Sequence, residues 1–323
     1  MTQSKESTHP IDDEPALPIS EEAEEQWRKW KAFSQDAYAR YQDTIEQIRR
    51  RHPGLTSYDI ADRVDGTQGT FAWHWGAASE VRESINSLNA WGVRLHEWQA
   101  WNAVLSSYSD EEDRWEVLHH FLEPVVFYCM LQPSGFADRL ALTAENLLHQ
   151  ANQRMSPEEP DRLVQDERPG KPIRRADRRR QLGKLGKRWS KFKAFQQALH
   201  ALDSDEYSRL TRNYRDLAAH SFSPRLMLGE IARATRSIGP SMDMVLLDGG
   251  RYRRTEHPTK RAVTYAMGSQ EPLSLEETYK ANLAEYQRAK KAIDCFSALA
   301  AELCEAIDLK DASAKPVVDD PAP

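Results

Sequence analysis

The sequence has few features that would cross-link the chain or place it in a membrane. Its three cysteines, Cys129, Cys295 and Cys304, show no C-x-x-C spacing, and the odd count argues against a disulfide framework. Residues 1–25 lack a basic segment followed by an apolar run, and the most apolar window, residues 122–131, is too short to span a bilayer. We therefore expect a cytoplasmic protein with reduced thiols and no membrane segment.

Several catalytic signatures are also absent. The chain has no Walker phosphate loop, nucleophile elbow, H-E-x-x-H pair or zinc-ligand spacing, which disfavours NTPase, esterase and metallohydrolase functions. The adjacent His119 and His120 would point to different faces of a helix, so they do not predict a joint metal site. We expect neither a metal nor a cofactor.

Length and composition predict one large helical domain with polar ends. Residues 1–20 and 310–323 are polar and contain proline, which predicts disordered tails, the first of them acidic. Between them, residues 21–309 are expected to form a single α-helical domain. Residues 156–186 break the apolar periodicity and are rich in proline and charge, which predicts an inserted basic, charged loop with one short helix at most.

Apolar spacing predicts an all-α bundle with extra N-terminal helices. Helices are expected over residues 21–51, 76–108, 110–130 with a kink or end at Pro124, 136–155 after a turn at 132–135, 207–220, 224–237 after a Ser223–Pro224 start, and 274–309. Residues 244–250 and 261–266 read as strands of one small β-hairpin inserted before the last long helix. Aromatic residues 71–75 surround His74 and predict either a core-filling turn or an exposed base-stacking platform.

One stretch, residues 207–220, combines an apolar stripe with polar groups of chemical use. Tyr207, Leu210, Tyr214 and Leu217 share helical spacing, while polar side chains follow the other side. The segment Arg215-Asp216-Leu217-Ala218-Ala219-His220 resembles the R-x4-6-H motif of the HEPN superfamily, in which a polar residue often follows the arginine. The bare spacing also occurs at 114–119 and 251–257, but without the polar second residue on an amphipathic helix.

The resemblance implies an all-helical fold and, in many members, a metal-independent endoribonuclease; other members are inactive binding or antitoxin-partner modules. Arg215 would stabilise charge on the phosphate, His220 would move the proton and Asp216 would orient His220. Five residues at about 100° each place Arg215 and His220 about 140° apart around a helix. Either the helix breaks before His220, or two copies form a composite site, as the family's dimers do; we favour the dimer. Alternatively, Arg215 and Asp216 are solvated charges and His220 is a C-terminal cap.

The strongest local charge lies just upstream of this motif. A cluster of cations is opposed in the sequence only by Asp177, and such a density can grip a phosphate backbone in a salt-dependent way. The alternative is a solvated linker that balances the acidic tail. The candidate RNA-binding residues are Arg174, Arg175, Arg178, Arg179, Arg180, Lys184, Lys187 and Arg188.

These observations lead to three hypotheses. The first is a cytoplasmic homodimer that cuts RNA without a metal, with a toxin or defence role and a cognate antitoxin or other partner protein implied by the resemblance. The second is a catalytically inactive module of the same fold that binds RNA or a partner protein. The third is a helical scaffold in which the motif occurs by chance.

Overall fold

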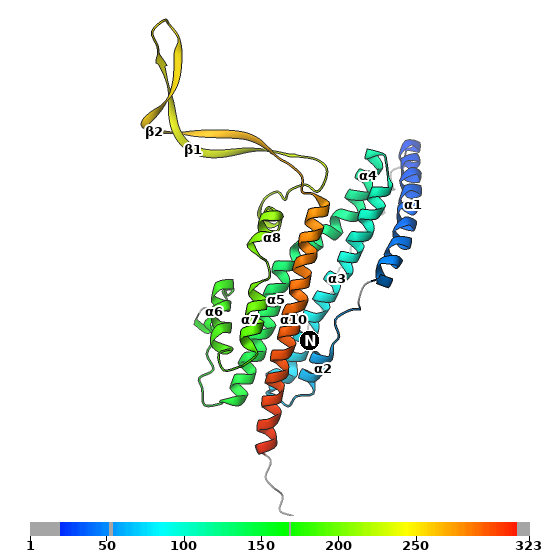
Figure 1. Cartoon of the computed structure of the whole chain (residues 1–323), viewed down its shortest axis with the longest axis vertical. Coiled ribbons are helices and arrows are strands. Elements are labelled where there is room, and N and C mark those ends of the chain that lie inside the picture. Colours follow the sequence, from blue (N-terminus) through cyan, green and yellow to red (C-terminus); the bar gives the residue numbers. More distant parts are fainter. Residues whose placement is uncertain (1–19, 52–53, 168, 315–323) are drawn as a thin grey trace, which may run out of the picture.

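The computed structural model describes residues 20–51, 54–167 and 169–314, so the predicted tails fall almost entirely outside the described residues. The chain is mostly helical with a two-stranded antiparallel hairpin before the last helix, which confirms that part of the predicted fold class (Figure 1). Its elements are α1 (Glu21–Arg51), α2 (Asp59–Asp65), η1 (Trp73–Ala77), α3 (Ala78–Ser107), α4 (Glu111–Val117), η2 (Leu118–Leu122), α5 (Glu123–Met155), η3 (Val164–Glu167), α6 (Arg175–Leu185), α7 (Phe192–His200), α8 (Asp205–Leu210), α9 (Tyr214–His220), β1 (Ile231–Leu246), β2 (Tyr252–Gln270) and α10 (Leu275–Ala314).

Three long helices, α3, α5 and α10, lie side by side and supply the centre of the helical body (Figure 1). Their facing sides bury large side chains, among them Trp91, Phe136 and Phe296. Helix α1 covers α3 on the outside, where the Tyr41 and Trp101 rings stack with centroids 4.5 Å apart. Burying rings of this size removes much apolar surface from water, which is the main stabilising contribution to such a bundle.

The predicted turn at residues 132–135 is wrong, because α5 runs without interruption from Glu123 to Met155 through Pro133. A proline inside a helix leaves the carbonyl four residues earlier without its N–H donor. Here that carbonyl belongs to Cys129, and it accepts a hydrogen bond of 2.9 Å from the Asn282 side chain of α10. The hydrogen bond from Asn282 therefore replaces the one that Pro133 cannot donate, and the helix continues through the proline.

The start of α5 also differs from the prediction. Pro124 occupies the first turn of α5, where its missing N–H is tolerated, and the helical segment before α5 ends two residues earlier, at Leu122. The irregularity comes earlier, at the π-helical turn η2, which separates α4 from α5. Asp110 caps α4 by accepting hydrogen bonds from the backbone N–H groups of Glu112 and Asp113.

The predicted helix 207–220 is two short helices, α8 and α9, and not one. Arg212 and Asn213 both lie in the left-handed region, with φ of 50° and 56°, and turn the chain between them. Asparagine tolerates this conformation, whereas arginine adopts it rarely. The Arg212 guanidinium donates a hydrogen bond to the Glu271 carbonyl beyond β2, which holds the strained turn in place. The helix end near His220 is confirmed.

The helix predicted for residues 224–237 is absent. Leu226 instead forms a parallel bridge with Leu273, and both side chains are buried. The Met227 N–H donates to the Leu273 carbonyl over 2.9 Å, and the chain then enters β1 at Ile231. The backbone pairing of Leu226 with Leu273, nearly fifty residues away, replaces the helix start that Ser223 and Pro224 predicted. This pairing is favoured because it also buries the two leucine side chains.

The hairpin is confirmed, but its strands have 16 and 19 residues and start well before the predicted ones. It projects from the helical body as a long bent ribbon (Figure 1), and we call residues 231–270 the arm. The register shifts between Pro240 and Met242, where Ser241 lies opposite residues 257–260. The tip turn uses Gly249 and Gly250 at φ of 94° and 77°, values that favour glycine.

The last helix begins as predicted. The Ser274 hydroxyl accepts a hydrogen bond of 3.3 Å from the Glu277 N–H, which is one half of a capping box. Helix α10 extends to Ala314, so Lys310 to Ala314 belong to it and not to the predicted tail. The predicted loop 156–186 contains the 3-10 turn η3 and the whole of helix α6, which carries much of the basic segment.

Candidate functional site

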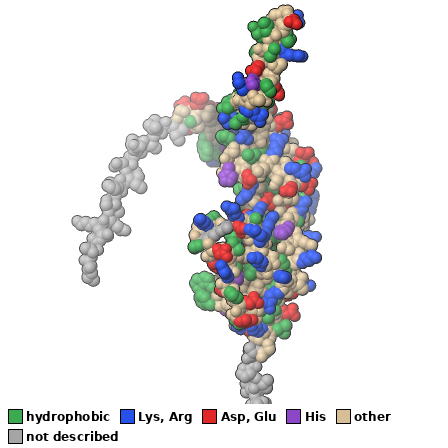
Figure 2. Space-filling model, turned by 90° about the vertical axis from the view of Figure 1, so that its left-hand side faces the viewer, with side chains coloured by type: hydrophobic (Ala, Val, Ile, Leu, Met, Phe, Trp, Pro, Cys, Tyr) green, Lys and Arg blue, Asp and Glu red, His purple; other side chains and the backbone are tan. Residues whose placement is uncertain are grey.

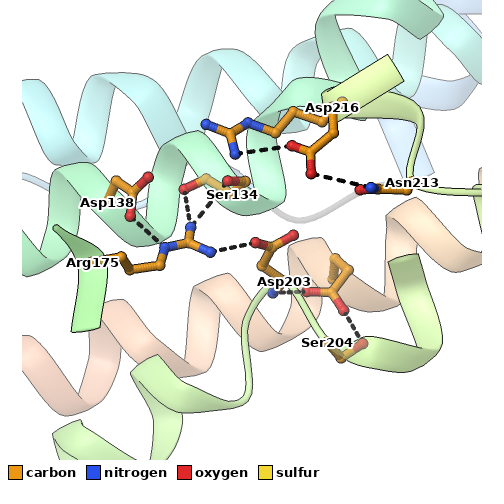
Figure 3. Close-up of polar contacts among 9 residues, drawn as sticks. Ser134, Asp138, Arg175, Asp203, Ser204, Asn213 and Asp216 are labelled. Atoms are coloured by element: carbon orange, nitrogen blue, oxygen red, sulfur yellow. Dashed lines mark hydrogen bonds and ion pairs between the residues drawn. The ribbon is translucent and has the colours of Figure 1, made fainter. Parts of the chain in front are cut away.

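The predicted catalytic residues all lie on α9 and are all exposed. The Arg215 guanidinium lies 3.4 Å from the Asp216 carboxylate, and the Asn213 amide donates to the same carboxylate over 3.1 Å (Figure 3). Asp216 therefore contacts Arg215 and Asn213, and the structure shows no hydrogen bond from it to His220. In the described part of the chain, the His220 ring makes no hydrogen bond.

One chain does not bring Arg215 and His220 together. Helix α9 is regular from Tyr214 to His220, so the expected break before His220 does not occur. The two side chains therefore leave the helix about 140° apart, as ideal geometry requires. His220 is the last helical residue, and Ser221 follows in a non-helical conformation.

A hollow of about 600 Å³ lies beside α9, between the start of α5 and the segment that leads into β1. Its walls combine apolar side chains with polar groups: the His119 ring lies 3.1 Å from the Glu123 carboxylate, and Arg225 lines the opposite segment. Burial raises the pKa of Tyr214, which also lines the hollow. The lining comes from three separate stretches of chain, so no single motif in the sequence marked it.

The basic residues on and around α6 are of two kinds, those that hold the helix to other elements and those that are exposed to solvent. Arg175 is half-buried and holds Asp138 and Asp203 at 2.7 and 2.6 Å while donating to both oxygens of Ser134 (Figure 3). Burial opposes the charge, but the two carboxylates raise the pKa of Arg175, so it stays a cation. It fastens α6 to α5 and to the turn before α8, where a nucleic acid would have to displace three partners.

Arg178 is similarly engaged. Its guanidinium lies 3.4 Å from the buried carboxylate of Glu145, in a polar cluster with Gln165 and Gln181 under η3. Arg179 is half-buried, and Arg180 pairs with Asp177. Five predicted RNA-binding residues remain exposed, and Figure 2 shows Lys and Arg side chains mixed with acidic ones on the face that α6 occupies; the five are Arg174, Arg180, Lys184, Lys187 and Arg188.

Helices α6 and α9 lie along the same helix, α5. Tyr214 of α9 packs against Phe127, with ring centroids 6.3 Å apart, whereas Arg175 of α6 contacts Ser134 and Asp138. Seven to eleven residues of α-helix separate these contacts, or about 10–16 Å along the axis. A strand of nucleic acid lying along α5 would pass both the exposed cations of α6 and the exposed α9.

The aromatic segment 71–75 takes parts of both predicted arrangements. Trp73 is buried and donates a hydrogen bond of 2.9 Å to the Val64 carbonyl, as expected of a core-filling turn. Phe71 and Trp75 are instead each 81% exposed, with stacked rings 6.1 Å apart. This pair is available to bind a flat apolar ligand, but Thr70 contacts Gln150 on α5, far along that helix from α9.

The described residues include no group of three or more His, Cys, Asp or Glu side chains arranged to hold a metal ion. None of the described helices has an apolar stretch long enough to cross a bilayer. No family model, curated protein or solved structure matches the chain, so comparison with known proteins does not place it in a family.

Proposed function

We propose that this protein binds RNA along α5, with the exposed cations of α6 holding the phosphate backbone, and that two copies cut it without a metal ion. The proposed roles follow the resemblance: Arg215 stabilises the charge on phosphorus and His220 transfers the proton. The observation that carries this proposal is the exposure of both Arg215 and His220 on α9. Buried side chains could not reach a phosphodiester. Neither side chain lines the hollow, which Tyr214 and Ala218 of the same helix face.

Two copies are part of the proposal because the regular α9 directs Arg215 and His220 apart. A two-fold axis near α9 would set Arg215 of one copy beside His220 of the other. The cleavage step is proton-balanced: His220 takes the 2'-hydroxyl proton as that oxygen bonds to phosphorus, and the bond from phosphorus to the 5' oxygen breaks. The His220 imidazolium then gives the proton to the departing 5' oxygen, which leaves a 2',3'-cyclic phosphate. The toxin or defence setting and the cytoplasmic location stay predictions.

Cleavage of labelled RNA in EDTA tests the nuclease proposal. We expect the wild type to cut and both Arg215→Ala and His220→Ala to lose at least 100-fold in rate, in line with loss of a general acid–base or charge-stabilising group. Arg209→Ala is the matched control, because Arg209 is an exposed arginine on neighbouring α8 whose guanidinium contacts only its own helix backbone. Equal cleavage by all four proteins, or by none, contradicts a nuclease at α9.

Binding without turnover is the second candidate function. The ion pair between Arg215 and Asp216 supports it, because a guanidinium that already pairs with a carboxylate binds a phosphate less strongly. In that case RNA retention would fall steeply with salt but no product would form. Replacing Arg174, Arg180, Lys184 and Lys187 by Glu should abolish retention, whereas Arg178 is left intact because it supports Glu145 in the fold.

A further inference from the structure

The arm leaves most of its side chains exposed to solvent. No residue of β1 or β2 is buried, although isolated two-stranded hairpins are only marginally stable in water. One face of its inner half consists of Ala234, Ile238, Val263, Tyr265 and Met267 with two arginines, and Met267 is 83% exposed. The opposite face has small and hydroxyl side chains. An exposed apolar face on one side of a ribbon indicates a surface that another molecule covers.

The charge of the arm differs in sign from that of the chain. Residues 231–270 contain seven Lys and Arg against three Asp and Glu, while the whole chain has a net charge of −6. Among the described residues, none of these seven cations forms a salt bridge. Arg251, Arg253 and Arg254 lie at the tip with the exposed Tyr252 and Leu246; Arg254 is on the same face of the ribbon as this pair, and Arg253 is on the opposite face. We call these five residues the arm tip.

The arm tip lies far from every part of its own helical body (Figure 1), so a carboxylate from outside the arm that pairs with its arginines would belong to another molecule. A strand of 16 residues extends on the order of 50 Å, and even with the bend this reaches well beyond the body. The ribbon has the reach to cross to a neighbouring copy.

A complementary surface exists at the start of α4. Glu111, Glu112 and Asp113 follow one another there, and no salt bridge engages them in the part of the chain that the structure describes. Trp115 adjoins them, 46% exposed, with its ring stacked on His119 at 4.7 Å. This surface, which we call the acidic start of α4, offers carboxylates for the arginines of the arm tip and an aromatic face for its apolar side chains.

We propose that the arm tip binds the acidic start of α4 in a second copy of the chain, and that two copies exchange arms reciprocally. The contact is isologous, because each copy gives one tip and one acidic start, so the assembly closes as a dimer. The arm is an assembly element and not a nucleic-acid element. The composite nuclease site also needs two copies, but assembly is measured without RNA, so either proposal can fail alone.

Charge reversal with sedimentation velocity tests the exchange on the full chain. The tip variant Arg251→Glu/Arg253→Glu/Arg254→Glu and the helix variant Glu111→Lys/Glu112→Lys/Asp113→Lys should each weaken dimerisation at least tenfold in Kd. An equimolar mixture of the two variants should associate again, because both contacts in the mixed dimer are complementary. Arg49→Glu/Arg50→Glu/Arg51→Glu makes the same change in charge at the exposed end of α1 and should stay dimeric.

A cross-link on folded, near-native protein covers the case in which the helix variant unfolds. Arg253→Lys keeps the charge of the arm tip, and carbodiimide should then couple Lys at position 253 to Glu111, Glu112 or Asp113. In a mixture of isotopically light and heavy protein, half of the coupled peptides should combine the two labels. A monomeric wild type, a tip variant that still dimerises, or loss of RNA retention by the tip variant with an unchanged dimer would each overturn the proposal.

Discussion

The helical body and the arm differ in what holds each together. In the body, side chains from distant stretches are enclosed, and Asn282 of α10 is fully buried with hydrogen bonds to three other helices. In the arm, every residue is at least partly exposed and backbone pairing supplies nearly all of the order. The comparison shows that stability and assembly can be assigned to separate regions of one chain, so substitutions in the two regions should have different consequences.

The largest effect is expected at Asn282. Its side chain accepts from Trp91 Nε1 over 2.8 Å and donates to the Cys129 carbonyl and to Tyr207. Asn282→Ala leaves the Trp91 N–H and the Cys129 carbonyl buried without these partners, whereas the Tyr207 hydroxyl still donates to the Met130 carbonyl. The substitution should lower the free energy of unfolding by about 3–5 kcal/mol. Denaturant titration measures it. Adding Pro133→Ala should recover about 1 kcal/mol, because the restored N–H satisfies Cys129 again; no recovery would contradict the role given to Asn282 at the proline.

A smaller effect is expected where α10 caps α7. The Glu302 carboxylate accepts from the Ser190 and Lys191 N–H groups at 2.8 and 2.9 Å. Burial alone would raise its pKa, but these hydrogen bonds outweigh burial and lower the pKa. Its stabilisation is therefore present above the unfolded pKa of 4.5 and is lost as the pH falls through the lower folded value.

Glu302→Gln should thus cost about 1 kcal/mol at pH 7, with the difference from wild type shrinking as the pH falls below about 4.5. Urea titrations at several pH values measure this. Glu305→Gln is the control, since Glu305 is exposed on the same helix. A difference in unfolding free energy between wild type and Glu302→Gln that does not change with pH would contradict a stabilising role for the charged Glu302 carboxylate.

The smallest effect is expected in the arm. Met267→Ala should change the free energy of unfolding of the helical body by less than about 0.5 kcal/mol, because the Met267 side chain is already in water. The same substitution at Met130, which is buried, should cost about 2–5 kcal/mol. Two equal values, measured by the same denaturant titration, would break the distinction between the two regions.

Much of the body could be predicted because its helices carry local signals. The spacing of Leu95, Trp98 and Trp101 marked α3, and Ser274 marked the start of α10. Predictions failed where a contact with a distant residue outweighed the local sequence signal. Pro133 predicted a turn, and the residue that compensates it, Asn282, lies 149 positions away in the sequence. Residues 224–230 were predicted to be helical, but Leu226 pairs with the distant Leu273 instead.

The candidate site was predicted only in part. Arg215 and His220 are exposed, as a site requires, but their divergence on α9 follows from helical geometry that the sequence already implied. The sequence could not tell which cations of 174–188 are tied to other elements, because the carboxylates that engage Arg175 and Arg178 lie on distant parts of the chain, whereas Arg180 pairs with Asp177 of its own helix. The hollow beside α9 was likewise invisible, since its walls meet only after folding.

By itself, the sequence determined the helical character, the positions of α1, α3 and α10, and the existence of a hairpin, because periodicity and capping act over a few residues. Only the tertiary structure decided that α5 continues through Pro133, that the 207–220 segment bends at Arg212 and Asn213, and that the hairpin extends into solvent as an arm. Those outcomes depend on hydrogen bonds and burial between residues far apart in the chain, whose energies no local pattern contains.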